Sequence, residues 1–213
     1  MHFLSTILEQ YITDHSQSEP EILQKLTRET HLKVIQPRMI TGHFQGRVLS
    51  LLSKIKAPKN ILEIGTYTGY SAICLAEGLT SDGSLHTIDI NEELNGMQRR
   101  FFQESGYGDQ IFQHTGDALK IIPTLDMVFD LIFIDAEKVS YDLYFEACIK
   151  KCRPGSIILS DNVLWSGKVV APLIAKDKAT KTLIDYNRKL KEDPRVETVL
   201  LPVRDGLTLS RVV

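Results

Sequence analysis

Five short apolar stretches of the sequence each end on or near an acidic residue that could bind a cation or a ligand hydroxyl group. The stretches NILEI, SLHTIDI, IFQHTG, DLIFID and GSIILSD all resemble strands. Their acidic residues are Glu63, Asp89, Asp117, Asp135 and Asp161. In an open α/β sheet, ligands bind beyond the carboxyl ends of the strands. Any one of these carboxylates could simply cap the next helix, but five at one edge would repel one another unless a cation or a hydroxyl-rich cationic ligand lay among them.

Three of the residues at this edge form a set of oxygen ligands. Asp135 ends the fourth strand, and Asp161 with Asn162 ends the fifth, which should lie beside it. Two carboxylates and an amide oxygen suit a hard divalent ion, Mg²⁺ first and then Mn²⁺ or Ca²⁺. On an octahedral ion they would leave about three positions for substrate and water. The competing interpretation is that the Asp-Asn pair only begins a turn.

A lysine follows this set closely. Lys138 lies three residues after Asp135. A lysine beside a divalent cation can lose its proton and serve as a general base. A loop lysine without such a site around it would only be solvated.

The turn after the first strand indicates which ligand binds there. Its glycines, Gly65 and Gly69, have the spacing G-x-x-x-G, whereas the dinucleotide fingerprint is G-x-G-x-x-G. Gly65 would let the backbone approach a ligand closely, and Asp89 could accept hydrogen bonds from a ribose diol. Glu63 would repel a phosphate but would suit an ammonium group. A ligand with an adenosine ribose, no phosphate and a cationic amino-acid end is S-adenosylmethionine, which the sequence therefore favours.

The elements that position these residues alternate between strand and helix. Helices are expected at 70–79, 92–105, 142–152 and 176–192, which predicts right-handed βαβ crossovers and helices on both faces of a parallel sheet. The last two strands, in 195–203 and 206–213, are too close for a crossover and must form an antiparallel hairpin. We therefore predict an α/β fold with a doubly wound, seven-stranded, mostly parallel sheet whose last strand is antiparallel.

The chain length of 213 residues predicts one domain. Helical segments at about 2–14, 19–31 and 42–56 form an N-terminal helical segment, 1–56, before a Rossmann-like core, 57–213. The hydrophobic content of 43% and net charge of -2 are typical of a soluble protein and argue against a general nucleic-acid binder. No signal peptide or membrane span is evident, and Cys148 and Cys152 are expected to be buried thiols, so a cytoplasmic location is predicted.

Six motifs together resemble those of the cation-dependent O-methyltransferases, the family of catechol and caffeoyl-coenzyme A O-methyltransferases. They are EIGTYTGYS, HTIDIN, FIDAEK, SDNVLWSGKV, DPRVETVLLP and DGLTLSR. With the segment PRMITGHFQGRVLSLL, which resembles the part that closes over the methionine end of the cofactor, they extend in order over about 39–211. The chain looks like a bacterial member. The resemblance implies a class I methyltransferase fold and a homodimer.

The resemblance also implies roles for individual residues. Asp135, Asp161 and Asn162 match the metal ligands, and Lys138 matches the catalytic lysine. The positions that match cofactor-binding residues are Thr41, Glu63, Gly65, Thr66, Ser71, Asp89, Asp117, Ala118 and Asp135.

These observations lead to one hypothesis and three alternatives. The hypothesis is in-line transfer of the sulfonium methyl to a hydroxyl of a vicinal-diol, catechol-like or related small aromatic acceptor, with the substrate oxygens on the metal and Lys138 as the base. Within the same family, the acceptor could instead be 5-hydroxyuridine in tRNA, for which the basic stretch 176–195 would be a footprint rather than a solvated helix face. A nicotinamide-dependent oxidoreductase is disfavoured by the missing fingerprint, and a non-catalytic binding protein by the complete Asp/Lys/Asp/Asn set.

Overall fold

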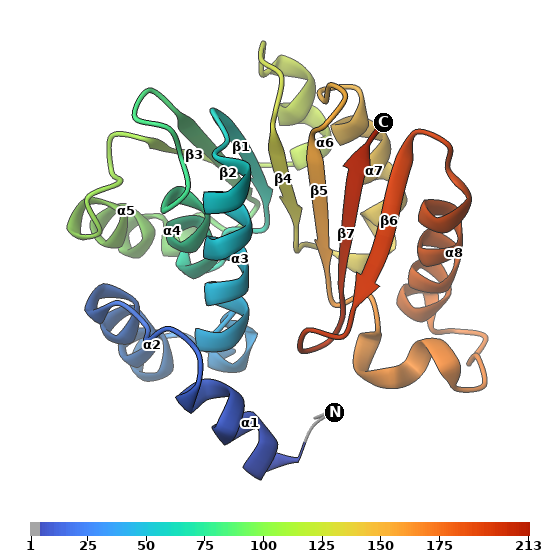
Figure 1. Ribbon diagram of the computed structural model, residues 1–213, viewed down its shortest axis with the longest axis horizontal. Coiled ribbons are helices and arrows are strands. Elements are labelled where there is room, and N and C mark those ends of the chain that lie inside the picture. The colour runs from blue at the N-terminus through green and yellow to red at the C-terminus, as the bar shows by residue number, and fades with distance from the viewer. Residues whose placement is uncertain (1–4) are drawn as a thin grey trace.

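A seven-stranded mixed sheet forms the centre of the computed structural model, which describes residues 5–213 (Figure 1). The strand order is β3-β2-β1-β4-β5-β7-β6. β1 to β5 are parallel, and β7 is antiparallel to both of its neighbours, as predicted. The strands are β1 (Asn60–Ile64), β2 (Ser84–Asp89), β3 (Ile111–Thr115), β4 (Leu131–Ile134), β5 (Ile157–Asp161), β6 (Val196–Leu201) and β7 (Leu207–Val212).

Helices cover both faces of the sheet (Figure 1). The α-helices are α1 (Thr6–Asp14), α2 (Glu21–Lys33), α3 (His43–Lys56), α4 (Tyr70–Ala76), α5 (Asn95–Glu104), α6 (Ala118–Ile121), α7 (Tyr141–Ile149) and α8 (Lys178–Glu192). Short 3-10 helices lie between them: η1 (Pro37–Met39), η2 (Glu92–Leu94), η3 (Ile122–Thr124), η4 (Lys138–Ser140) and η5 (Trp165–Val170). Most predicted helices occur within three residues of their predicted ends. The predicted helix at 2–14 begins outside the described residues, and α6 was not predicted.

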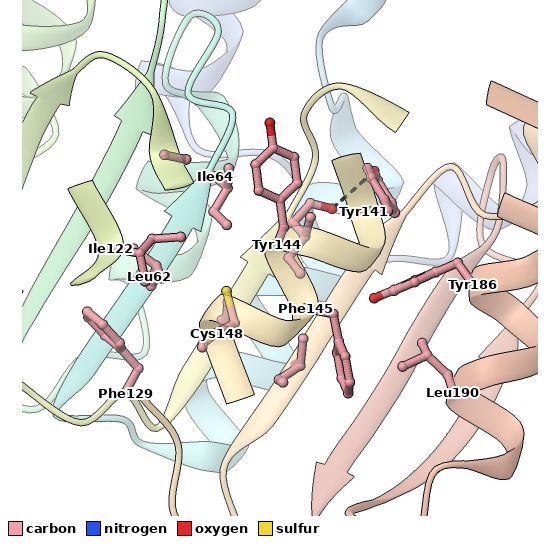
Figure 2. Packing of buried hydrophobic residues seen from close by; sticks show 14 of the residues in the cluster. Leu62, Ile64, Ile122, Phe129, Tyr141, Tyr144, Phe145, Cys148, Tyr186 and Leu190 are labelled. Carbon is pink, nitrogen blue, oxygen red and sulfur yellow. Dashed lines mark hydrogen bonds between the residues drawn. The ribbon is translucent and has the colours of Figure 1, made fainter. Parts of the chain in front are cut away.

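The core is two apolar layers, one on each face of the sheet. Because successive side chains of a strand point to opposite faces, Leu62 and Ile64 of β1 face one layer and Ile61 faces the other. Figure 2 shows Leu62 and Ile64 near Tyr144 and Cys148 of α7. The strands at the centre are thus buried on both sides, as parallel strands usually are, and they hold their carboxyl ends in fixed positions.

The prediction that Cys148 and Cys152 are buried thiols is confirmed for Cys148 and only partly for Cys152. Cys74 and Cys148 are buried, Cys152 is half-buried, and all three are free. Between residues 5 and 213 no helix has both the length and the apolar character needed to cross a membrane.

The order of the strands places a switch point between β1 and β4. From β1 the chain moves outward to β2 and β3, and it then returns to the other side of β1 to form β4 and β5. The crossovers on the two sides diverge here, and doubly wound folds bind their ligands beyond the carboxyl ends of the strands at this point. Glu63, Gly65 and Asp135 therefore flank the place where a doubly wound fold binds its ligand.

Candidate active site

Glu63 is a buried carboxyl group at the end of β1. Its side chain is fully buried, and its Oε2 accepts a 2.5 Å hydrogen bond from the Thr87 hydroxyl, whereas its Oε1 has no hydrogen-bond partner in the described part of the chain. Burial raises the pKa of Glu63 to about 8, and the nearby hydroxyl groups of Ser71 and Thr87 oppose the rise. A buried carboxyl oxygen without a partner suits a cationic hydrogen-bond donor.

Gly65 is required because the chain that leaves β4 approaches its backbone closely. Its φ of 100° lies in the region that favours glycine, and a Cβ added there would lie 1.9 Å from the carbonyl oxygen of Asp135. The sequence had suggested that Gly65 makes room for a ligand. In the structure, it first makes room for the chain that leaves β4, and it thereby brings the ends of β1 and β4 together.

Asp89 fastens the turn after β1. Its Oδ2 accepts hydrogen bonds from the backbone amides of Thr66 (3.0 Å) and Tyr67 (2.8 Å), and its Oδ1 accepts one from Asn91 (2.9 Å). The Thr66 hydroxyl is hydrogen-bonded to the Thr87 hydroxyl at 2.5 Å. Asp89 therefore shapes the loop 65–69, and its role towards a ribose stays a prediction.

Asp117 has the helix-capping contacts that any one of the five acids could have had. It is exposed, its side chain accepts a 2.9 Å hydrogen bond from the Leu119 amide, and it forms a long 3.9 Å ion pair with Lys120. Ala118, the next residue, is buried at the start of α6. Their predicted adenine contacts stay predictions.

Asp135, Asp161 and Asn162 come together because β4 and β5 are neighbours in the sheet. Asp161 is 3% exposed, and burial together with the charge of Asp135 raises its pKa to about 7. The backbone amide of Asn162, whose φ is 58°, donates to Asp161 Oδ1 at 2.7 Å. Two carboxylates with mutual repulsion and an amide side chain fit a hard divalent cation, which would relieve that repulsion. Within residues 5–213 no three His, Cys, Asp or Glu side chains gather as a metal site, so the predicted metal set would need the asparagine oxygen as its third ligand.

Lys138 is buried within this cluster. Its Nζ donates to Asp135 Oδ1 at 2.8 Å and to the Tyr141 hydroxyl at 2.7 Å. The Tyr141 hydroxyl in turn donates to the backbone carbonyl of Asp161 at 2.8 Å. The same hydroxyl also lies 3.3 Å from the carbonyl oxygen of Ile134, so Tyr141 contacts the ends of both β4 and β5 (Figure 2). The solvated loop lysine is therefore wrong as an interpretation, because Lys138 has two fixed partners.

Two residues that the sequence did not single out hold the N-terminal segment at the site. Gln45 of α3 is buried, and its Nε2 donates to Asp161 Oδ2 at 2.6 Å. Arg204, in the turn between β6 and β7, donates to the carbonyl oxygens of Ile40 (3.1 Å) and Thr41. Thr41, a predicted cofactor residue, is thus buried and pinned at the same end of the sheet. The only sequence signal for Gln45 is a polar residue on the inner face of an amphipathic helix.

Known proteins resemble this chain over nearly its whole length. A family profile described as O-methyltransferase matches residues 13–213. A caffeoyl-CoA O-methyltransferase of Eucalyptus gunnii is 37% identical, over 97% of this chain and 88% of the relative. Another from Petroselinum crispum is 36% identical, over 97% and 91%.

Solved structures agree with these relatives. An O-methyltransferase from Bacillus cereus in complex with SAH is 30% identical, with a TM-score of 0.89 over 98% of both chains. The O-methyltransferase TomG from Streptomyces achromogenes, in complex with SAM, is 31% identical, with a TM-score of 0.88 over 97% of this chain and 96% of TomG. The match confirms the class I methyltransferase fold and decides against the oxidoreductase alternative, whereas the bacterial source stays a prediction. The chain therefore belongs to the O-methyltransferase family, which confirms the enzyme class predicted from the sequence.

Proposed function

We propose that this O-methyltransferase transfers a methyl group from S-adenosylmethionine to a hydroxyl of a vicinal-diol, catechol-like aromatic acceptor with the help of a divalent cation. The observation that carries the proposal is the cluster of Lys138, Asp135 and Asp161 beside the glycine turn at the switch point. The caffeoyl-CoA relatives support an aromatic hydroxyl as the acceptor. The structures with SAH and SAM support the cofactor.

The cofactor would lie along the carboxyl ends of β1 and β2. Glu63, with its unpartnered Oε1, suits the ammonium of the methionine part, and Asp89 suits the ribose. Bound S-adenosylmethionine supplies an electrophilic methyl on sulfur. We propose that the remaining positions of the cofactor site are Thr41, Gly65, Thr66, Ser71, Asp117, Ala118 and Asp135.

The cation would be held by Asp135, Asp161 and Asn162, with Mg²⁺ the best fit to the oxygen donors and Mn²⁺ or Ca²⁺ as alternatives. A bound divalent cation makes a hydroxyl next to it more acidic. The protein's own part is to hold the base: Lys138 Nζ is fixed between Asp135 and the Tyr141 hydroxyl. Its neutral amine, which a neighbouring cation would favour, takes the proton from the acceptor hydroxyl with its lone pair. Since Asp135 directly follows β4 and Tyr141 begins α7, the protein positions the proton acceptor before the substrate arrives.

The alternative tRNA acceptor is weakened by the ion pairs around α8. Several basic residues of α8 and of the turn after it have acidic partners, which reduce the positive field that a nucleic acid would meet. The pairs are Lys181 with Asp185, Lys189 with Asp142 and Glu146, and Arg195 with Glu146 and Asp193. A methyl-transfer screen with labelled cofactor, covering catechols, caffeoyl esters, flavonoids and bulk tRNA, tests the proposed acceptor. Transfer to tRNA alone would contradict it.

Glu63→Gln is expected to flatten the pH dependence of stability of the cofactor-free protein. Between pH 4.5 and about 8 the native Glu63 holds a proton that the unfolded chain has lost. The free energy of unfolding therefore falls as pH rises through this window, by at most about 1.4 kcal/mol per pH unit from this group. The neutral glutamine removes that fall but should also weaken cofactor binding. Thermal unfolding at pH 5 to 9 and titration calorimetry measure the two effects; parallel stability profiles would contradict the buried, protonated carboxyl.

A homodimer is expected, and exposed apolar side chains on α3 and β6 support it. Leu51 and Ile55 of α3 are 60% and 74% exposed, and Val199 of the edge strand β6 is 58% exposed. Val199 lies opposite Leu209 in register, on the sheet face that α3 covers, and we propose that a second copy buries these exposed side chains. Sedimentation at micromolar concentration should give a dimer, and Ile55→Glu with Val199→Glu should give a monomer. A monomeric wild type would rule the dimer out.

A further inference from the structure

We infer that Gln45 is a positioning residue for the proposed metal site: it orients the carboxylate of Asp161 from the N-terminal helix α3. The inference rests on the proposed function, in which Asp161 is a metal ligand. It extends the site to a residue that lies 116 positions away from Asp161 in the sequence. Residues that orient metal ligands typically change metal affinity by about 10–100-fold when they are replaced.

Two hydrogen bonds fix the plane of the Asp161 carboxylate. Gln45 Nε2 donates to Oδ2 at 2.6 Å, and the backbone amide of Asn162 donates to Oδ1 at 2.7 Å. The second donor belongs to the strand end itself, so it cannot hold the carboxylate against rotation alone. Gln45 is the donor from outside the strand, and Gln45 and Asp161 are both at most 3% exposed. With both contacts in place, the remaining lone pairs of the carboxylate keep one direction.

The backbone of Gln45 has little freedom to move. The next residue, Gly46, lies so close to α4 that an added Cβ would be 2.6 Å from the Tyr70 ring and 2.9 Å from Cys74 Sγ. Two turns further along α3, the Ser53 hydroxyl donates to the carbonyl oxygen of Leu75 at 2.6 Å. The helix is thus fixed against α4 from the residue after Gln45 to Ser53, and it presents the glutamine to Asp161 at one distance.

The amide oxygen of Gln45 is an independent indication of a polar ligand. Gln45 Oε1 is buried and has no hydrogen-bond partner among residues 5–213. An unsatisfied buried acceptor costs about 1–3 kcal/mol. A water molecule bound to a divalent cation, or a substrate hydroxyl, is a strong donor for it. A purely structural glutamine would more simply have both ends of its amide satisfied within the protein.

Metal binding without substrate tests the inference. Mn²⁺ affinity is measured by calorimetry at one fixed pH for the wild type, Gln45→Leu, Gln45→Asn, Ser53→Ala and Asp161→Ala. Both Gln45 variants should bind Mn²⁺ about 10–100-fold more weakly, because leucine has no donor and asparagine is too short to reach Asp161. Ser53→Ala is the matched control: it removes a buried hydrogen bond between α3 and α4 that does not involve Asp161, and it should keep wild-type affinity. Thermal unfolding of each metal-free variant reports any loss of fold separately.

Two outcomes separate the inference from the function on which it rests. Wild-type Mn²⁺ affinity in Gln45→Leu and Gln45→Asn, with binding lost in Asp161→Ala, would overturn the role of Gln45 but leave the metal site standing. Wild-type affinity in Asp161→Ala would overturn the metal site itself and the inference with it. If the Gln45 variants do not fold, the side-chain amide signal of Gln45 in the ¹⁵N-labelled wild type decides. It should shift on titration with Mg²⁺, and an unchanged signal at saturating Mg²⁺ would overturn the inference.

Discussion

Removal of divalent cations with EDTA is expected to abolish methyl transfer and to leave the fold intact. Activity and folding are separable because Asp135, Asp161 and Asn162 lie at the end of the sheet, whereas the core beneath them is apolar. Without a cation, the carboxylates of Asp135 and Asp161 still repel each other, which is part of the reason that the pKa of Asp161 is raised to about 7. An acceptor hydroxyl would then lose the group that makes it acidic.

Activity and circular dichroism are measured before and after EDTA treatment and dialysis, and again after Mg²⁺ is added back. Full recovery with Mg²⁺ is expected, with an unchanged spectrum throughout. Activity that survives chelation and dialysis would show that the metal assignment is wrong. Loss of the spectrum with loss of activity would make the cation structural instead.

Replacement of Lys138 by methionine is expected to slow methyl transfer by ~10²–10⁴-fold, which is the usual contribution of a general base. Methionine keeps most of the length of the buried side chain but cannot accept a proton. Because Lys138 contacts Asp135 at 2.8 Å, its replacement also removes a positive charge beside a proposed metal ligand. Rates are therefore compared at saturating metal, and metal affinity is measured for each protein. The loss should shrink at high pH and with acceptors whose hydroxyl is already acidic, since those need no base.

Lys138→Arg separates the base from a charge that only steadies the loop. A guanidinium keeps the positive charge next to Asp135 but cannot give up its proton at working pH, so arginine should not restore the rate. Rates for a series of acceptors of rising acidity are measured for the wild type and both variants. High activity in Lys138→Arg, or equal dependence on acceptor acidity in all three proteins, would remove Lys138 from the mechanism.

The fold could be predicted largely from local patterns. Short apolar runs bounded by glycine, proline and helical segments give parallel strands, and the short link at 204–206 leaves an antiparallel hairpin as the only connection. Helix α6 was not predicted, because its four residues, 118–121, are too few to show a helical periodicity. The helix predicted at 70–79 ends at Ala76 in the structure, since helix ends depend on packing as well as on composition.

The candidate site could be predicted only where the topology alone brings residues together. Asp135 and Asp161 end neighbouring parallel strands, so their meeting follows from the strand order. Asp117 meets the same rule and yet caps a helix, because strand-end position does not tell a cap from a ligand. The partners Gln45 and Arg204 depend on how α3 and the last hairpin pack, which no local pattern encodes. The contact between Tyr141 and Lys138 could have been predicted from the sequence, since a tyrosine three residues after a lysine can face it on a helical turn.

The most direct test of the proposed function compares two acceptors that differ in a single hydroxyl. Labelled methyl transfer is measured to a caffeoyl-type diol and to the analogue with only one ring hydroxyl, each with and without Mg²⁺. We predict methylation of the diol with Mg²⁺ and negligible transfer in the other three reactions, because only two neighbouring oxygens can share one cation. Equal methylation of both acceptors, or methylation of the diol without the cation, would contradict a metal-dependent vicinal-diol O-methyltransferase.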